Sequence, residues 1–253
     1  MLNEKKEIFG VIHSYETLGA TDGPGLRFIL FTQGCHLRCK YCHNPDTQRT
    51  CRLENAAKNG FKVVSASEIA SEALKYKNYY GRRGGITASG GEPLLQIEFL
   101  TALFKIMKEN GVNTAIDTSG LEYSEKDENL GELLRLTDLI LLDVKHIDSE
   151  KCKALTGRGN ENFFKFARRL ESEKIPVWIR QVLVPGYTDD ETDLIKTREF
   201  IQSLNNVEKV EILPYHTLGK SKYEKLGIPY PLENVKSPTA EEVARAKKLL
   251  GVI

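Results

Sequence analysis

Three of the five cysteines in the chain lie within one stretch of eight residues. Cys35, Cys39 and Cys42 have the spacing C-x3-C-x2-C in the sequence GCHLRCKYCHN, residues 34–44. A structural zinc or iron–sulfur site normally has four protein ligands, so three clustered thiols are an incomplete set. A metal centre with one open position can also bind a substrate. The spacing therefore indicates a centre that takes part in chemistry.

Two kinds of metal centre are compatible with these thiols. A structural zinc knuckle could be completed by His36 or His43, because zinc accepts a Cys3His ligand set. Thiolates equally suit an iron–sulfur cluster, and a four-iron cluster held by three cysteines leaves one iron free. A typical knuckle uses two separated cysteine pairs, whereas these three thiols fall in one loop, which favours the cluster.

Six short runs rich in β-branched and apolar residues alternate with amphipathic helical stretches. The runs are residues 26–34, 85–91, 113–120, 139–145, 176–186 and 207–216. Alternating strands and helices predict a parallel sheet with right-handed crossovers, which is an α/β fold. Six units are two fewer than a closed eightfold barrel has. We therefore expect an open partial (β/α)6 barrel, with residues 1–253 forming a single domain.

Local signals also place several helices. In a capping box, a hydroxyl and a carboxylate three residues later satisfy exposed backbone amides. The three candidate boxes are Ser65 with Glu68, Thr188 with Glu191, and Thr239 with Glu242. Residues 97–110 repeat apolar side chains at helical spacing, and Gly111 follows as a stop signal.

Each run carries a polar group at, near or just beyond its carboxyl end, where barrels of this type build their active sites. These groups are the three cysteines, Ser89 to Glu92, Asp117 with Thr118, Asp143 with Lys145, Arg180, and His216. Side chains from distant parts of the sequence would thus converge on one rim. This convergence predicts an enzyme.

The overall composition limits the partners and the compartment. The chain has 36 basic and 35 acidic residues, and such a balance argues against a nucleic-acid or polybasic membrane partner. Its apolar runs are too short to cross a bilayer, and its first residues lack the apolar core of a signal peptide. We expect a cytosolic (cytoplasmic) protein in which Cys51 and Cys152 are ordinary free thiols.

The motifs resemble those of a known enzyme family. The three-cysteine pattern with an aromatic residue, Tyr41, before the last cysteine resembles the signature of radical S-adenosylmethionine enzymes, and GGEP (90–93) resembles their second motif. Seven segments occur in the order found in the pyruvate formate-lyase activating enzymes: DGPGLRF, GCHLRCKYCHNPDT, TASGGEPLLQ, DTSG, LLDVK, WIRQVLVPG and EILPYHTLGKSKYEKLG. The resemblance extends from about residue 10 to about residue 249.

The resemblance implies both cofactors and a reaction. Cys35, Cys39 and Cys42 would ligate a 4Fe–4S cluster whose free iron chelates the amino and carboxylate groups of S-adenosylmethionine. One-electron reduction of the sulfonium would give a 5′-deoxyadenosyl radical, which removes a hydrogen atom from a glycine α-carbon of pyruvate formate-lyase. The electron donor would be a flavodoxin or a ferredoxin, and the chain itself would be a monomer.

The resemblance also implies roles for individual residues around S-adenosylmethionine. Gly90, Gly91 and Glu92 would hold its ammonium group. Asp117, Thr118 and Asp143 would supply oxygen ligands to a monovalent cation, and Lys145 would pair with the carboxylate. The remaining cofactor contacts would come from Tyr41, His43, Val144 and His216. Asp22 and Arg180 would face the incoming glycyl loop.

Two alternatives remain at this point. One is activation of a different glycyl radical enzyme; many activators of that kind carry a cysteine-rich insert after the first motif, and residues 43–85 contain only Cys51. The other is a non-catalytic zinc-binding protein, which would explain the cysteines but not the polar groups at the other strand ends.

Overall fold

The computed structural model describes residues 7–252. Its contacts divide the chain into two compact units. The first consists of Met1–Cys35, Arg49–Thr118 and Glu125–Ile140. The second consists of His36–Gln48, Ser119–Ser124 and Leu141–Ile253. The single domain expected from the sequence stays a prediction. None of the described helices is both long and apolar enough to span a membrane.

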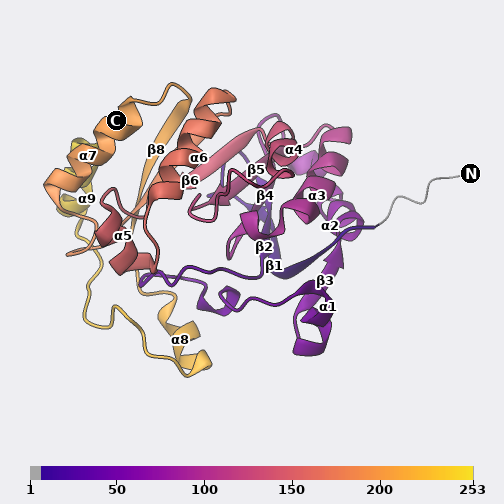
Figure 1. The fold of residues 1–253 in the computed structure, drawn as a ribbon, viewed down its shortest axis with the longest axis horizontal. Coiled ribbons are helices and arrows are strands. Elements are labelled where there is room, and N and C mark those ends of the chain that lie inside the picture. Colours follow the sequence, from indigo (N-terminus) through magenta and orange to yellow (C-terminus); the bar gives the residue numbers. More distant parts are fainter. Residues whose placement is uncertain (1–6, 253) are drawn as a thin grey trace, which may run out of the picture. The chain divides into compact units, whose positions relative to one another are not determined.

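The first unit contains five complete strands. They are β1 (Phe9–Gly19), β2 (Arg27–Thr32), β3 (Lys62–Ser65), β4 (Gly85–Gly90) and β5 (Asn113–Thr118). Their order in the sheet is β3-β1-β2-β4-β5 (Figure 1). β1 is antiparallel to β2 and β3, whereas β2, β4 and β5 are mutually parallel. The carboxyl ends of these three parallel strands therefore lie at the same edge.

Helices of the first unit follow the predicted pattern. They are α1 (Leu53–Ala56), α2 (Ala66–Leu74), α3 (Ile97–Glu109) and α4 (Leu130–Arg135), with the short 3-10 helices η2 (Ala57–Asn59), η3 (Lys77–Tyr79) and η4 (Pro93–Gln96). α3 buries the apolar face expected from its sequence, including Phe99, Leu103 and Met107. The capping box at Ser65 and Glu68 is confirmed at the start of α2.

β6 (Leu139–Asp143) begins among the residues of the first unit and ends among those of the second. β7 (Val177–Leu183) and β8 (Val207–Pro214) follow it in the strand order and are parallel to each other. The helices of this unit are η1 (Pro45–Thr47), α5 (Ser149–Thr156), α6 (Glu161–Ser172), α7 (Glu191–Gln202), α8 (Lys220–Leu226) and α9 (Ala240–Leu250).

The predicted α/β fold with an open sheet is confirmed, with more strands than the six expected. Within the described residues the sheet has eight strands and runs from β3 at one end to β8 at the other without closing. The six predicted runs correspond to β2 and to β4 through β8. The sequence predicted neither β1, which is antiparallel to β2, nor β3, which is antiparallel to β1.

One of the three predicted capping boxes is wrong. The box at Thr239 and Glu242 is present at the start of α9, but α7 is capped by Asp190, whose carboxylate accepts from the Asp193 amide. Thr188 instead fastens the turn after β7, where its hydroxyl donates to the Val182 carbonyl at 2.7 Å and accepts from the Val184 amide at 2.7 Å.

Arg27 is a fully buried charge at the amino ends of the parallel strands of the first unit. Its guanidinium donates to the side-chain oxygens of Thr87 at 2.6 Å and Asn113 at 2.9 Å. It also donates to the backbone carbonyls of Pro24, Arg83 and Ile86. Burial lowers the pKa of Arg27 to about 10, so it remains charged at neutral pH.

We expect Arg27→Met to lower the free energy of unfolding by about 3 kcal/mol or more, because several buried acceptors would lose their donor. Urea denaturation of the apoprotein measures this loss. Arg82→Met is the control, since Arg82 is an exposed residue of the turn before β4, and its loss should stay within about 0.5 kcal/mol. Equal stability of the two variants would contradict this account of Arg27.

Candidate active site

The cysteine loop of the second unit, which carries Cys39 and Cys42, contacts the carboxyl end of α5. The Cys42 amide donates to the Cys39 carbonyl at 3.0 Å, which closes a turn between the two thiols. The Arg38 and Lys40 amides donate to the Thr156 and Leu155 carbonyls at 2.7 and 3.0 Å. These carbonyls belong to the last turn of α5, where the helix has no further amides to donate to them. The loop thus completes the helix and is held by it.

The surroundings of this loop are apolar. Tyr41 is buried in a cluster that includes Leu155, Val184 and Tyr215, with Cys39 packed against it. Burial raises the pKa of the Cys42 thiol. A bound metal stabilises the thiolate and offsets such a shift. Two half-buried thiols against an apolar cluster therefore fit a soft metal centre better than they fit a reactive surface site.

Cys35 belongs to the first unit, directly after β2. It is buried, and the preceding Gly34 carbonyl accepts from the Glu92 amide at 2.8 Å. Among residues 7–252, no three His, Cys, Asp or Glu side chains gather closely enough to hold a single metal ion. In a cluster each thiolate binds its own iron, and three thiolates are the donor set that such a cluster takes.

The GGEP segment after β4 approaches its neighbour too closely for any side chain at its first glycine. Gly90 has φ +115°, and a Cβ there would lie 2.3 Å from the Thr32 amide nitrogen. The Gly91 amide donates to the Thr32 carbonyl at 3.0 Å. Only glycine combines this φ with this approach. The segment is therefore fixed against the end of β2.

Acidic groups from β4 and β5 meet at the same edge. The buried Glu92 carboxylate accepts from the Thr118 hydroxyl at 2.5 Å and from the Leu94 amide at 3.2 Å. The Asp117 carboxylate accepts from the Ser89 hydroxyl at 2.8 Å. Within the first unit the structure thus brings together Gly90 to Glu92, Asp117 and Thr118, as the strand-end argument predicted.

A buried ion pair follows β6 in the second unit. The Lys145 ammonium lies 2.8 Å from Asp143 Oδ2, and Arg180 Nε lies 3.6 Å from Asp143 Oδ1. Burial alone would raise the pKa of Asp143, but Lys145 and Arg180 hold it below its ordinary value. Burial would likewise lower the pKa of Lys145, but Asp143 and then Tyr41 hold it well above its ordinary value. Both groups are charged at neutral pH.

The backbone fixes this charged group to β7. The Val144 amide donates to the Arg180 carbonyl at 2.8 Å. Lys145 Nζ also lies 5.6 Å from the centre of the Tyr41 ring, at the distance of a cation–π contact. The second unit therefore gathers Tyr41, Asp143, Val144, Lys145 and Arg180. The sequence reading placed Arg180 toward a partner, and the structure directs its side chain to Asp143.

Two histidines predicted for the cofactor pocket lie against each other. The rings of His43 and His216 are 3.9 Å apart between centres, and His43 Nε2 is 3.1 Å from the His216 carbonyl oxygen. Burial lowers the pKa of His43, so its ring is neutral at pH 7. Lys222 of α8 binds Asn44 Oδ1 at 2.7 Å, which fastens α8 to the cysteine loop. The sequence reading missed Lys222, because no local pattern links it to residue 44.

Asp22 lies before β2, at the opposite end of that strand from Cys35. Its backbone carbonyl accepts from the Thr87 hydroxyl at 2.7 Å, and Thr87 in turn accepts from Arg27. Its carboxylate accepts from the Thr21 hydroxyl. Asp22 is therefore held by its backbone, with its side chain at the surface of the turn.

Comparison with known proteins identifies the family. The sequence profile of the Radical SAM superfamily matches residues 29–197. The pyruvate formate-lyase-activating enzyme of Staphylococcus epidermidis is 54% identical over 246 residues, covering 96% of this chain and 95% of that protein. The chain belongs to the pyruvate formate-lyase-activating enzyme family. The enzyme of the same name from Staphylococcus aureus matches with the same identity and coverage.

Solved structures agree with this assignment. A domain of the pyruvate-formate lyase-activating enzyme from Bacteroides vulgatus superposes with a TM-score of 0.55 at 30% identity, covering 66% of this chain and 93% of that chain. Streptococcus suis SuiB bound to its precursor peptide SuiA superposes with a TM-score of 0.64 at 16% identity, covering 88% of this chain and 44% of that chain. This second likeness shows the fold alone.

Membership in the activating-enzyme family makes the chain a radical S-adenosylmethionine enzyme, an oxidoreductase. The cofactors that the family implies are a 4Fe–4S cluster and S-adenosylmethionine. The described residues fit these cofactors, because Cys39 and Cys42 lie in one hydrogen-bonded turn, Cys35 follows β2, and a charged, buried lysine lies beside the cysteine loop of the second unit.

The buried pair gives a prediction for stability against pH. Asp143→Asn should destabilise the apoprotein by about 3 kcal/mol at pH 7, because Lys145 would stay buried without its carboxylate. The Asp143 pKa is lowered in the folded state and the Lys145 pKa is raised. The stabilisation is thus complete between the ordinary pKa values, about 4 and 10.4. It is lost as the pH falls through the lowered value or rises through the raised one.

Urea denaturation across this pH range measures the difference between wild type and variant. Glu233→Gln serves as the control, since its pair with Lys220 is roughly half exposed and should contribute at most about 1 kcal/mol. A wild-type advantage that persists unchanged at pH 2 would contradict the pairing described here.

Proposed function

We propose that this chain activates pyruvate formate-lyase under anaerobic conditions. The activation consists of reductive cleavage of S-adenosylmethionine at a 4Fe–4S cluster and removal of a glycine α-hydrogen from the partner, which leaves a protein glycyl radical. The observation that carries the proposal is the 54% identity, over 96% of the chain, to enzymes of that name. Cys51 is the only cysteine between residues 43 and 85. This favours pyruvate formate-lyase as the partner over glycyl radical enzymes whose activators carry a cysteine-rich insert.

Cys35, Cys39 and Cys42 are the proposed cluster ligands. When bound, the cluster and S-adenosylmethionine together supply a carbon radical by one-electron reduction of the sulfonium. The protein orients these groups and keeps water away. The apolar packing around Tyr41, with Cys39 against it, supports that part of the role.

Charged and polar groups at the strand ends are the proposed contacts for the methionine part of S-adenosylmethionine. Gly90, Gly91 and Glu92 would hold its ammonium, with the carboxylate of Glu92 already aimed by Thr118. Lys145 would pair with its carboxylate. Lys145 holds a carboxylate now, that of Asp143 at 2.8 Å, so the substrate would offer the same chemical group to the same ammonium.

A monovalent cation is proposed beside that carboxylate. Asp117, Thr118 and Asp143 would supply hard oxygen ligands. If Lys145 turns from Asp143 toward the substrate, Asp143 is left with less positive charge nearby, and a cation would restore the balance. This exchange of partners is the physical reason for proposing the ion.

The adenosine part is proposed to lie against aromatic and apolar side chains of the second unit. The candidates are Tyr41, His43, Val144 and His216. The close pair of His43 and His216 presents flat rings, and a neutral His43 avoids adding positive charge next to the sulfonium.

Asp22 and Arg180 are the proposed contacts for the partner's glycyl loop. Asp22 precedes β2 and Cys35 follows it. A six-residue strand spans about 20 Å, so an extended partner segment of similar length would run from Asp22 toward the cluster. A flavodoxin or ferredoxin is the proposed electron donor, and we propose that the chain acts as a cytoplasmic monomer.

The test combines reconstituted enzyme, S-adenosylmethionine, a chemical reductant and pyruvate formate-lyase under anaerobic conditions. Electron paramagnetic resonance of the partner reports the glycyl radical. A radical formed only on another glycyl radical enzyme would overturn the choice of partner. One zinc per chain, with neither iron nor sulfide after reconstitution, would overturn the reaction itself.

The cysteine assignment predicts a sharp difference among the five thiols. The variants Cys35→Ala, Cys39→Ala and Cys42→Ala should each abolish S-adenosylmethionine cleavage, because each substitution removes one of the three cluster ligands. Cys51→Ala and Cys152→Ala should leave both cleavage and iron content intact, and they are the matched controls. Loss of the cluster in the Cys51 variant would show that the ligand set proposed here is wrong.

Asp22 gives a separate prediction about the protein substrate. Asp22→Ala should bind S-adenosylmethionine with wild-type affinity yet install about a hundredfold less glycyl radical, since an ångström of misplacement at the reacting carbon is enough for such a loss. Asp127→Ala, at an exposed loop position, is the control. Parallel loss of cofactor affinity and radical yield would place Asp22 in the cofactor pocket.

A further inference from the structure

One helix of the second unit joins the cysteine loop to the segment that carries Lys145. α5 begins at Ser149, four residues after Lys145. Its last turn accepts the Arg38 and Lys40 amides of the cysteine loop. An eight-residue helix is about 12 Å long. The distance between loop and segment is therefore set by the position of this helix.

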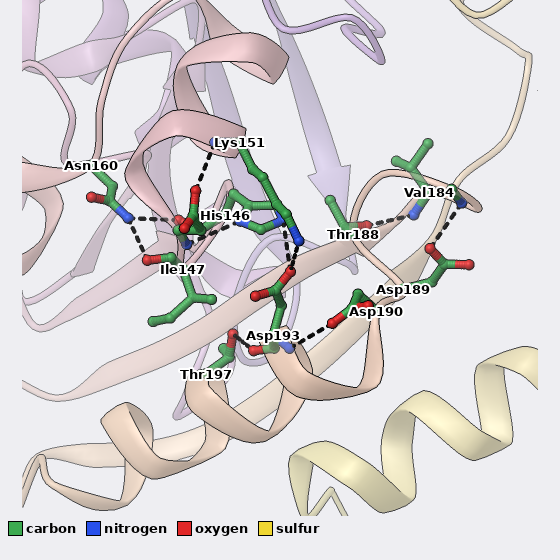
Figure 2. Close-up of polar contacts among 12 residues, drawn as sticks. His146, Ile147, Lys151, Asn160, Val184, Thr188, Asp189, Asp190, Asp193 and Thr197 are labelled. Atoms are coloured by element: carbon green, nitrogen blue, oxygen red, sulfur yellow. Dashed lines mark hydrogen bonds and ion pairs between the residues drawn. The ribbon is translucent and has the colours of Figure 1, made fainter.

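The amino end of α5 is held by a network of polar contacts (Figure 2). The Asp148 carboxylate caps the helix by accepting from the Lys151 amide at 2.9 Å. His146 Nδ1 accepts from the Asp148 amide at 3.0 Å. The Asn160 amide group donates to the His146 and Ile147 carbonyls at 3.0 and 2.7 Å. Residues 146–148 are thus fixed through both backbone and side chains.

Asp193 ties this network to α7, as Figure 2 shows. Its carboxylate Oδ2 lies 2.5 Å from the Lys151 ammonium and 3.7 Å from His146 Nε2. Asp193 itself is only 6% exposed. It stands in the first turn of α7, where its amide is capped by Asp190. One buried carboxylate therefore contacts both α5 and the segment before it.

We propose that Asp193 is a positioning residue for the active site: by holding Lys151, with His146 packed beside it, Asp193 fixes α5 and thereby the spacing between Lys145 and the cysteine loop. The inference rests on the proposed function, in which Lys145 pairs with the substrate carboxylate and Cys39 and Cys42 hold the cluster. S-adenosylmethionine would then be bound both by Lys145 and by the cluster on the cysteine loop, and α5 sets the distance between these two contacts. Reaction rates depend steeply on such spacing.

The first test uses Asp193→Asn in the reconstituted enzyme. Iron and sulfide content should stay at the wild-type level, while affinity for S-adenosylmethionine falls about tenfold, because the two groups that bind it would no longer be held at a fixed spacing. The change that S-adenosylmethionine induces in the paramagnetic resonance signal of the reduced cluster should be incomplete. Glu191→Gln is the control, because it lies in the same helical turn in an exposed pair with Arg245.

A second readout needs no cofactor. In the apoprotein, amide hydrogen exchange at Arg38 and Lys40 should become about tenfold faster in Asp193→Asn, because these amides are protected by α5. Exchange at Ile179, inside β7, should not change. Faster exchange at both places would mean general destabilisation and would overturn the positioning role.

Variants of Lys151 test the same contact from its other side, and they serve if Asp193→Asn folds poorly. The Lys151 side chain is about half exposed, so Lys151→Met should fold and should reproduce the loss of affinity and of Arg38 and Lys40 protection. Lys151→Arg keeps a cation for Asp193 and should restore both. Wild-type values in Lys151→Met, or no rescue by Lys151→Arg, would overturn the inference.

Lys145→Met separates this inference from the proposed function. If it binds S-adenosylmethionine normally, the proposed role of Lys145 fails, and with it the purpose assigned to Asp193. If Lys145→Met loses affinity while Asp193→Asn and Lys151→Met match wild type, the positioning role alone fails. Loss of affinity in all three, with the Glu191 control unchanged, supports both.

Discussion

A buried ion pair at the end of β6 is the interaction on which the second half of the site depends. Asp143 and Lys145 are both charged although each is largely removed from water. Replacing water around two ions costs several kcal/mol, which their attraction returns only if the geometry is good. The result is close to balance. An ammonium held at this balance point can exchange one carboxylate for another if Asp143 gains another positive charge as Lys145 leaves it, and in the proposed function the monovalent cation supplies that charge.

The rigid parts of the site explain why such an exchange need not disturb the fold. Gly90 presses backbone against backbone at the end of β2, and Glu92 is aimed by the Thr118 hydroxyl. Neither arrangement depends on Lys145. Polar groups that are already satisfied within their own strand ends can meet a ligand without first being reorganised.

Periodicity and strand-end logic were sufficient to predict the parallel strands, the open α/β sheet, and the grouping of Gly90 to Glu92 with Asp117 and Thr118. They failed for β1 and β3, because these two antiparallel strands mix exposed polar residues into their runs and resemble loops. They also failed at Thr188, where the hydroxyl satisfies the turn after β7 and leaves the capping to Asp190. Two capping patterns overlap there, and tertiary contacts decide between them.

The residues that sequence reading missed share one property: their partners are distant in the chain. Arg27 contacts groups up to 86 positions away, and Lys151 meets Asp193 across 42 positions. No local pattern reveals such a pair. Only the fold shows that Arg27 organises the turn carrying Asp22, or that Asp193 lies beneath the helix joining Lys145 to the cysteine loop.

Asp193 lies near two basic side chains, Lys151 and His146, and only Lys151 is charged in the neutral range. Burial lowers the pKa of His146 although Asp193 opposes the shift, so the ring is neutral and its Nδ1 can accept from the Asp148 amide. A protonated ring has no acceptor, and the amide at the start of α5 would lose its partner. Asp193 raises the pKa of Lys151 above its ordinary value, so Lys151 carries the charge throughout the neutral range. The link between α5 and α7 is thereby kept independent of the one titratable ring within it.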